Sequence, residues 1–284
     1  MTNQYIGRFA PSPTGRLHAG SLAAALASFI DARAHHGQWL IRIEDVDTGR
    51  CKKEWADDIL QTLSALQMHS DGEVIWQSKR IDRYTNVLNQ LIESGKAYGC
   101  SCTRLEIEKA NKALGLKSNH YPGTCRTGAK GAIRSWRFLT NHEKVTFTDR
   151  WLGEYSQDVE TEVGDFVIKR ADGLFAYQLA VVIDDHDCGV TDIVRGADLI
   201  DNTPRQIALM RALDWNEPRY MHIPLVLNDR HEKLSKQAGA RPLGNDLMLE
   251  LVHAWRHLGF EEIRADSFEA FYQEASLQWA NRFL

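Results

Sequence analysis

The sequence predicts an α/β protein built around a parallel sheet, and three observations lead to this prediction. An apolar run at 5–9 precedes a turn rich in glycine and proline, an apolar-periodic segment follows at 22–36, and a second apolar run follows at 39–43. Strand, turn, helix and strand in this order form a βαβ unit, in which the two strands are parallel. Parallel sheets bind ligands at the carboxyl ends of their strands, so functional residues are expected in the turns after each strand.

The composition is that of an ordinary globular protein. The chain has 284 residues, of which 43% are hydrophobic and 25% charged, enough for one large domain or two small ones. Its formal net charge of -4 does not by itself indicate a nucleic-acid binder, although a local basic face is compatible with it. The N-terminus carries no basic segment followed by an apolar core, and no apolar run approaches the roughly 20 residues of a membrane span. We therefore expect a cytoplasmic protein.

The turn after the first strand, residues 8–21, reads RFAPSPTGRLHAGS. We expect Ser21 to cap the following helix, whose N-terminus offers unpaired N–H groups and the positive end of a dipole to a polyphosphate. Gly20 would let the ligand approach the backbone closely, and His18 could hydrogen-bond a phosphate. The tetrapeptide His-x-Gly-Ser alone fits an ordinary turn and helix cap equally well.

An acidic run, RIEDVDTGR at 42–50, follows the second strand. In isolation it is typical of a solvated acidic turn. Its position beside a phosphate-binding turn favours Glu44 as the carboxylate that holds a ligand ammonium group. Asp45 and Asp47 are expected to order the loop through local backbone hydrogen bonds.

Three of the five cysteines form a cluster, Cys100, Cys102 and Cys125. In a reducing compartment this indicates a metal site rather than disulfides, because three thiolates supply three corners of the tetrahedral zinc geometry. On general grounds His120 would be the fourth ligand, since imidazole commonly accompanies thiolates. Three unrelated buried cysteines are the alternative. A zinc ion closed by four protein ligands would be structural, because no position is left for water.

Basic residues lie close to these cysteines in the sequence, and they could contact RNA phosphates without reading base sequence. They are Arg104, Lys109, Lys112, Arg126 and Lys130. The same charges are also compatible with a plain solvated face.

The rest of the chain predicts further helices and strands. Helices are predicted for 52–68, 81–94, 104–116, 203–213, 246–258 and 268–279. The pattern is β-rich over 133–147, and strands are predicted for 165–170, 174–179, 180–183, 190–194 and 220–227. The Asp172-Gly173 turn predicts a hairpin between 165–170 and 174–179, whereas the runs at 180–183 and 190–194 predict buried parallel strands.

Three local details follow from this assignment. Thr203 is expected to cap its helix, with Pro204 at the first helical position. Asp184, Asp185 and His186 would lie at the end of a strand, where they would form either a hydrogen-bond cluster or a metal or catalytic relay.

A lysine pair follows the strand predicted at 220–227. The loop at 228–237 reads NDRHEKLSKQ, and Lys233 and Lys236 could fold over a triphosphate and offset the charge on the leaving pyrophosphate. A lone Lys-Leu-Ser-Lys is a weak motif, because polar loops produce it often.

In this order, the motifs resemble the signatures of class I aminoacyl-tRNA synthetases in their glutamate branch. The turn at 8–21 resembles the HIGH signature, and the run at 42–50 resembles the family's Arg-Ile-Glu-Asp segment. The segment at 233–237 resembles KMSKS, with Leu for Met and Gln for the last Ser. The resemblance covers nearly the whole chain, and it implies a Rossmann-type parallel-sheet catalytic domain.

The resemblance also implies a division into domains. The catalytic domain would span 1–238, with a zinc-containing insertion at about 98–165 between its two halves. A short helical tail at 239–284 would stand in place of an anticodon-binding domain. This truncation, with the cysteine pattern and the pocket motifs, implies the family's truncated branch. That branch activates L-glutamate with ATP and esterifies it to the queuosine base in the anticodon of tRNA(Asp).

Roles for individual side chains are implied by the same resemblance. L-Glutamate would be bound by Arg8, Ser12, Glu44, Tyr177 and Arg195. ATP with Mg²⁺ would be bound by Gly20, Ser21, Lys233 and Lys236, with His18 and Lys236 acting in catalysis. The truncated branch has Cys-x-Cys followed by Tyr-x-x-x-Cys, which implies Tyr121 rather than His120 as the fourth zinc ligand.

One position departs from the family's pattern. Discriminating glutamyl enzymes carry Asn where this chain has Val181, which puts the preference for glutamate over glutamine in question. Arg195 nevertheless favours an anionic side chain, because a buried guanidinium needs a counter-charge.

Two other functions stay open at this point. One is a small enzyme that charges the 3′ end of tRNA(Glu) or tRNA(Gln), and the other is an inactive paralogue that binds an adenylate or RNA. A monomer is expected in each case.

Overall fold

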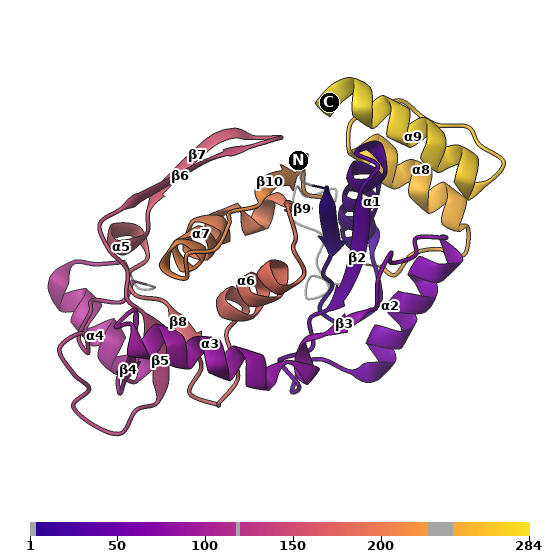
Figure 1. Cartoon of the computed structure of the whole chain (residues 1–284). Coiled ribbons are helices and arrows are strands. Elements are labelled where there is room, and N and C mark those ends of the chain that lie inside the picture. Colours follow the sequence, from indigo (N-terminus) through magenta and orange to yellow (C-terminus); the bar gives the residue numbers. More distant parts are fainter. Residues whose placement is uncertain (1–3, 118–119, 227–240) are drawn as a thin grey trace.

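The computed structural model describes residues 4–117, 120–226 and 241–284. It confirms the α/β class, with parallel strands at the centre and helices packed around them (Figure 1). Within the described residues, no helix is both long enough and apolar enough to cross a membrane.

The N-terminal half is the predicted βαβ unit, extended by one strand. β1 (Ile6–Phe9), β2 (Gln38–Ile43) and β3 (Ile75–Trp76) pair in parallel, in that order. The helices α1 (Ala19–Ala34) and α2 (Lys53–Ala65) connect them. Eight consecutive positions of α1, 25–32, are buried, so this helix is packed on all sides rather than on one face.

The second half contributes another parallel pair, β9 (Asp192–Gly196) and β10 (Arg219–Ile223), connected through the 3₁₀ helix η2 (Ala197–Asn202) and α7 (Thr203–Ala212). The two halves meet where β1 lies beside β9. There the Thr191 backbone N–H donates to the Ile6 carbonyl at 2.9 Å. The carboxyl ends of β1, β2 and β9 therefore face one region of the molecule.

Two predicted strands are wrong, because residues 177–187 form a helix, α6 (Tyr177–Asp187). The turn at Gly173 exists, with φ at +88°, and β8 (Val167–Lys169) precedes it. The second arm of the predicted hairpin makes only one antiparallel bridge to β8, Lys169 with Phe175, before α6 begins. Every position of α6 from 178 to 185 is buried, and a helix buried on all sides gives the same continuous apolar run as a buried strand.

A smaller antiparallel sheet carries the cysteines. It consists of β4 (Ala97–Cys100), β5 (Ser135–Phe138) and β8, and α4 (Arg104–Leu114) packs beside it. The 3₁₀ turn η1 (Gln77–Lys79) and the long helix α3 (Ile81–Glu93) join it to the first half, along the lower edge of Figure 1.

A second antiparallel element is the hairpin of β6 (Lys144–Asp149) and β7 (Gly153–Asp158), followed by α5 (Val159–Glu162). β6 pairs in parallel with β10 at a single position, so the hairpin extends away from the sheet (Figure 1).

The C-terminal helices α8 (Leu247–His257) and α9 (Phe268–Phe283) match the two predicted helices and pack against α1. Trp255, Phe271 and Trp279 are fully buried in the core that they share with α1. The Trp279 indole N–H donates to the buried Asp31 carboxylate at 2.8 Å. The tail is therefore part of the first hydrophobic core.

Candidate active site

A cavity of about 550 Å³ opens at the carboxyl ends of β1, β2 and β9, where a parallel sheet is expected to bind ligands. The turn after β1, the start of α1, the loop after β2, the start of α6 and the end of β9 form its wall. The predicted site residues on this wall are Arg8, Ser12, His18, Ser21, Glu44, Tyr177 and Arg195. Gly20 lines an adjoining cavity of about 190 Å³ together with His18 and Ser21. The structure thus brings together side chains from four separate segments of the chain.

The start of α1 differs from the prediction in its cap. His18, not Ser21, is the N-cap, and the helix begins at Ala19. The Ser21 backbone N–H donates to Nδ1 of His18 at 3.3 Å, and the His18 backbone N–H donates to the Ser21 hydroxyl at 2.8 Å. Because Nδ1 accepts this hydrogen bond, the neutral imidazole ring of His18 carries its proton on Nε2, which can act as a hydrogen-bond donor. Both side chains still lie at the positive end of α1.

Glu44 directly follows β2, and its side chain is only 8% exposed. Arg42 donates to its carboxylate at 3.3 Å from Nη2. Burial raises the pKa of Glu44, and the charges of Arg42 and Arg8 oppose this rise only in part. A buried carboxylate that is under-compensated in this way is stabilised by a further cation, such as an ammonium group.

Arg8 lines the cavity, but Asp185 holds its guanidinium. Nε and Nη2 of Arg8 donate to the Asp185 carboxylate at 3.0 and 3.3 Å, and Nη1 of Arg42 donates to the same carboxylate at 2.6 Å. Although burial raises the pKa of Asp185, the two arginines outweigh it and lower the pKa. The predicted contact of Arg8 with a substrate carboxylate would therefore add to an existing ion pair.

Asp184 belongs to a hydrogen-bond cluster, which was one of the two sequence-based alternatives, but the cluster lies on α6 and not at the end of a strand. Its carboxylate accepts from Nε2 of Gln77 at 2.7 Å, Nε of Arg80 at 2.6 Å and the Tyr84 hydroxyl at 2.8 Å. Among the described residues, neither Asp184 nor Asp185 belongs to a group with metal-ligating geometry. The cluster fastens α6 to η1 and α3.

Arg195 lies at the end of β9, on the part of the cavity wall opposite Glu44, and a buried hydrogen-bond network holds its guanidinium. Its Nη2 donates to the Thr203 hydroxyl at 2.7 Å, its Nε donates to Nε2 of His222 at 3.1 Å, and its Nη1 donates to the Tyr177 hydroxyl at 3.4 Å. Thr203 was predicted to cap α7, and this prediction is wrong, because its hydroxyl binds Arg195 instead. Asn202 takes the N-cap position, and Pro204 becomes the second helical residue.

His222 accepts from Arg195 because Asp149 fixes its tautomer. Nδ1 of His222 lies 2.6 Å from the Asp149 carboxylate, which can only accept, so the neutral ring carries its proton on Nδ1 and presents a lone pair at Nε2. Burial lowers the pKa of His222, and the nearby Arg195 charge adds to this, whereas the bond to Asp149 opposes it. The guanidinium of Arg195 is thus held by neutral groups.

Val181 is fully buried in the second core and is not part of the cavity wall. The substitution that departs from the family pattern therefore does not touch the part of the pocket that the structure describes. Lys233 and Lys236 lie outside the described residues, and their roles stay predictions.

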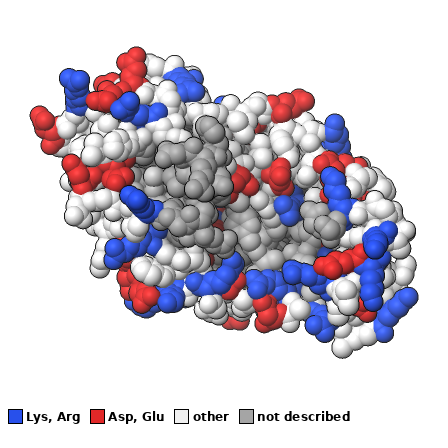
Figure 2. Space-filling view, turned by 180° about the vertical axis from the view of Figure 1, so that it is seen from behind, with Lys and Arg blue, Asp and Glu red and all other residues white. Residues whose placement is uncertain are grey.

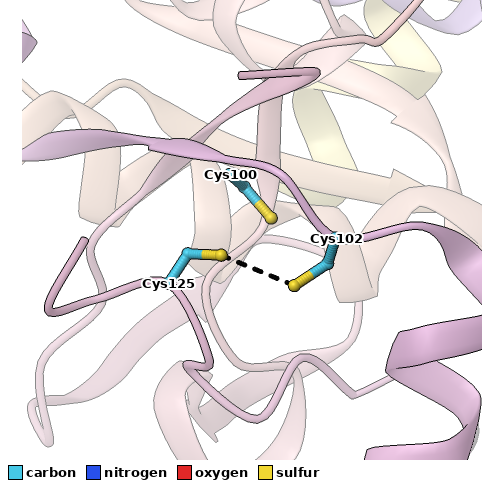
Figure 3. A group of neighbouring side chains, drawn as sticks. All are labelled: Cys100, Cys102 and Cys125. Atoms are coloured by element: carbon cyan, nitrogen blue, oxygen red, sulfur yellow. Dashed lines mark hydrogen bonds between the residues drawn. The ribbon is translucent and has the colours of Figure 1, made fainter. Parts of the chain in front are cut away.

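The three clustered cysteines meet, with all three Sγ atoms within 4.8 Å of one another (Figure 3). The Tyr121 hydroxyl lies 3.3 Å from Sγ of Cys100 and 3.8 Å from Sγ of Cys102, and Sγ of Cys102 lies 3.5 Å from Sγ of Cys125. Around zinc, with Zn–S bonds of about 2.3 Å, the edges of a tetrahedron measure about 3.8 Å. These four atoms therefore fit a metal such as zinc. His120, a described residue, is not part of the group.

Electrostatics favour a thiolate at Cys125, whereas burial raises the pKa of the Cys102 thiol to about 11. Burial raises the pKa of the Cys125 thiol, but hydrogen bonds from the Tyr121 hydroxyl and the Ser101 backbone outweigh it and lower the pKa to about 6. A thiolate is the form in which cysteine binds metal.

Sequence reasoning missed Asp149 and His222, which support Arg195, and it gave Arg42 no role, although Arg42 supports Glu44. It selected Asp185 as part of a cluster but did not predict its bonds to Arg8 and Arg42. The signals were weak, because a single His or Asp inside an apolar strand gives no indication of its partner. Arg42 was the one residue with a usable signal, since a charged side chain in a buried strand needs an opposite charge.

A cavity lies at the carboxyl ends of the parallel strands, and a histidine-capped helix N-terminus and buried charged side chains line it. These features agree with the class I aminoacyl-tRNA synthetase catalytic domain that the sequence motifs resemble. The comparison with known proteins agrees. The family model described as tRNA synthetases class I (E and Q), catalytic domain, matches residues 6–260, and the chain belongs to this family of ligases.

The relatives include close ones. The chain is 53% identical over 288 residues to the glutamyl-Q tRNA(Asp) synthetase of Bordetella bronchiseptica, covering 98% of this chain and 90% of the relative. It is 49% identical over 291 residues to the protein of the same name from Cupriavidus metallidurans, covering 99% and 93%. Among solved structures, a glutamate tRNA ligase from Elizabethkingia meningosepticum, in complex with its amino acid, matches with a TM-score of 0.72 at 27% identity. That match covers 83% of this chain but only 52% of the ligase.

Proposed function

We propose that this protein activates L-glutamate with ATP and transfers the glutamyl group to the queuosine base in the anticodon of tRNA(Asp). One observation carries the proposal: the cavity holds an under-compensated carboxylate, Glu44, and a guanidinium supported by neutral groups, Arg195. This charge pattern complements an amino acid with an anionic side chain. Near-full-length similarity to proteins named glutamyl-Q tRNA(Asp) synthetase supports the choice of acceptor.

In this proposal, each end of glutamate has its own partner. Glu44 accepts hydrogen bonds from the α-ammonium group, and its raised pKa falls again when that cation arrives. Arg195 and the Tyr177 hydroxyl bind the side-chain carboxylate. Ser12 and Arg8 orient the α-carboxylate, with Arg8 fixed in place by Asp185.

ATP lies over the start of α1 in the proposed complex. His18 donates from Nε2 to a phosphate oxygen, and Gly20 and Ser21 lie at the helix N-terminus, where backbone N–H groups and the helix dipole favour anions. Lys233 and Lys236 are proposed to bind the departing pyrophosphate, and Mg²⁺ accompanies the nucleotide.

Two displacements make up the proposed reaction. First, an oxygen of the glutamate α-carboxylate attacks the α-phosphorus of ATP, and the bond to the bridging oxygen breaks, which gives glutamyl adenylate and pyrophosphate. Second, a hydroxyl of the modified base attacks the activated carbonyl, loses its proton and displaces AMP. Positioning and electrostatic stabilisation supply most of the rate acceleration in the first step, because the protein forms no covalent bond to the substrate.

The cysteine cluster is proposed to hold a structural zinc ion. Cys100, Cys102 and Cys125 would bind as thiolates, and the Tyr121 oxygen is the proposed fourth ligand. The ion would tie the loop around Tyr121 to β4 and leave no open position for catalysis.

A second candidate function is supported by the likeness to a glutamate tRNA ligase. An enzyme of that kind would esterify the terminal ribose of tRNA(Glu) after the same activation step. Both functions use the same pocket, so the site of attachment on the RNA distinguishes them.

The test incubates the protein with labelled glutamate, ATP and unfractionated tRNA that either contains or lacks queuosine. The label is then mapped by nuclease digestion and acid gels. We expect label only in the anticodon fragment of queuosine-containing tRNA(Asp). Label at the 3′ end of tRNA(Glu), independent of queuosine, would support the second candidate instead.

A further inference from the structure

A second cleft, with a volume of about 650 Å³, lies between the small antiparallel sheet and the start of α7. This volume is in the range of pockets that hold a small organic ligand. Four arginines from four different segments line it: Arg104, Arg137, Arg170 and Arg205. None of the glutamate pocket's wall residues is part of its lining.

Carboxylates leave most of this positive charge uncompensated. Asp165 lines the cleft, but it is fully buried and already accepts from Arg126, Tyr98 and Thr140. Glu108, the other acidic residue in the lining, is exposed on α4. Arg170 pairs with Asp47 and Asp172. In the described part of the chain, Arg104, Arg137 and Arg205 form no salt bridge.

Arg137 is the most informative of these residues, because it is only 8% exposed. Its Nη1 donates to the Asp165 backbone carbonyl at 2.7 Å, and its guanidinium stacks 3.6 Å above the Tyr121 ring centroid. Its Nε has no hydrogen-bond partner within the described residues. No carboxylate pairs with this buried guanidinium, and an anionic ligand would add a counter-charge to it beside the proposed zinc site.

Arg205 repeats this pattern from the other side of the cleft. Its Nη2 donates to the Asp201 carbonyl at 3.2 Å and to the Asn202 side chain at 3.0 Å, while its buried Nε lacks a partner among described residues. Burial lowers the pKa of Arg205. Two independent segments thus hold guanidinium groups whose Nε atoms are buried and unpartnered.

Hydrogen bonds connect the wall of this cleft to segments that carry the glutamate pocket. Arg170, on its wall, donates from Nη1 to Asp47 at 2.9 Å, and Asp47 belongs to the loop that carries Glu44. On the other side, Asn202 accepts from both Arg205 and Gln178, and Gln178 directly follows Tyr177. A strand of RNA that reaches the glutamate pocket would therefore lie next to this cleft.

The lining could contact a sugar and a base as well as a phosphate, because it is partly apolar. Ile107, Val163, Phe166 and Val167 add apolar surface to the arginines. Guanidinium planes are among the groups on which proteins stack an unpaired base, and the apolar side chains add contact area beside them. On the face of the molecule seen in Figure 2, basic residues are interspersed with acidic ones.

We propose that this cleft binds one nucleotide of the RNA substrate, next to the base that accepts glutamate, with its phosphate on Arg137 and Arg205. The inference rests on the proposed function, because it takes RNA as the second substrate. The guanidinium groups position the strand and carry no base specificity.

The test measures binding of a fluorescent anticodon stem–loop of tRNA(Asp) by anisotropy, over a series of salt concentrations. Arg205→Gln removes one proposed phosphate contact, and Arg264→Gln, a residue that is 93% exposed on the tail, removes the same charge elsewhere. We expect R205Q to weaken RNA binding about tenfold, and the slope of log affinity against log salt to fall by about 0.7 to 0.9. R264Q should match the wild type in both.

A second variant covers the case in which R205Q alters the fold, which its thermal unfolding would reveal. Arg104→Gln changes an exposed residue at the start of α4 and should also weaken RNA binding and lower the salt slope. Inorganic phosphate is titrated in parallel as a competitor, and we expect it to displace the RNA only at millimolar concentrations.

The outcomes separate this inference from the proposed function. If the wild type transfers glutamate to RNA but R205Q and R104Q bind the stem–loop as R264Q does, only the cleft assignment is overturned. If R205Q loses affinity for inorganic phosphate and not for RNA, the cleft is a small-anion site and the inference is wrong. If the wild type binds no RNA, both proposals fail together.

Discussion

Replacing His222 with asparagine tests how the proposed specificity arginine is held. His222 is fully buried, donates from Nδ1 to Asp149 and accepts from Arg195 at Nε2, 3.1 Å away. Asparagine can keep a donor towards Asp149 but has no acceptor at the Nε2 position. The variant therefore removes the contact to Arg195 while limiting the cost of leaving a buried carboxylate unpaired.

The magnitude follows from the lost hydrogen bond. A hydrogen bond to a charged group contributes about 1.5–3 kcal/mol, which corresponds to about 10-fold to 150-fold in an equilibrium constant. We expect the KM for glutamate in ATP–pyrophosphate exchange to rise within this range, whereas the KM for ATP stays within about twofold, because Arg195 is proposed to bind only the amino acid.

The control and the refuting result are both simple. His142→Asn makes the same substitution on a side chain that is 78% exposed and should change neither KM. Equal increases in the KM values for glutamate and ATP would show that the variant acts by general loosening of the fold. An unchanged KM for glutamate would refute the role given to the Asp149–His222 pair.

Four further predictions follow from the same structure. Glu44→Gln should raise the KM for glutamate about 100-fold in the exchange assay, because a neutral amide cannot replace a buried counter-charge for the ammonium group. The KM for glutamate should be constant above about pH 6.5 and rise in more acidic buffer, because His222 has a lowered pKa and its protonated ring would direct an N–H at Arg195. Cys102→Ser should reduce bound zinc, measured by atomic absorption, from about one per chain, and should lower the melting temperature. Trp279→Ala should destabilise the protein by about 3–5 kcal/mol in urea unfolding, since the ring is fully buried.

Each of these predictions has a control or a contrary result. Glu54→Gln, on a residue that is 63% exposed, should leave the KM for glutamate unchanged. The acidic rise in KM should be smaller in His222→Asn than in the wild type, where protonation of Glu44 is the remaining cause, and an equal rise in both proteins would contradict the role of His222. Cys188→Ser should retain zinc, because Cys188 is not in the cluster. A Trp279→Ala protein as stable as the wild type would show that the tail does not share the first core.

The pH prediction also has a consequence for stability. Because the folded protein keeps His222 neutral, its pKa is lower than the value of about 6.5 in the unfolded chain. The unfolded state therefore binds more protons below that pH, and stability falls as the pH drops. Above about pH 6.5 both states are neutral at this residue, so its contribution is constant.

Much of the fold could be predicted because local patterns and tertiary structure agree. The βαβ unit is set by its turn and by apolar periods that differ between strand and helix, and the structure places β1, α1 and β2 within a few residues of the predicted ranges. The prediction failed for 174–183, where α6 is buried on all sides. An unbroken apolar run has no period, so it cannot distinguish a helix from a strand.

The site shows the same division between local and long-range information. Glu44, His18 and the cysteines could be selected because each lies in a motif whose spacing reflects its chemistry. The Asp149–His222 pair joins residues that are 73 positions apart, and no local pattern records that pairing. The cap of α7 was also predicted wrongly, because Thr203 bonds to Arg195 instead of to its own helix.

The central claim is that glutamate is transferred to a base of the anticodon and not to the end of the RNA. It is tested most directly with an isolated anticodon stem–loop that carries queuosine and has no acceptor end, incubated with the protein, ATP and labelled glutamate. We expect stable labelling of this fragment and none of the same fragment without queuosine. Labelling of intact tRNA with no labelling of the stem–loop would contradict it.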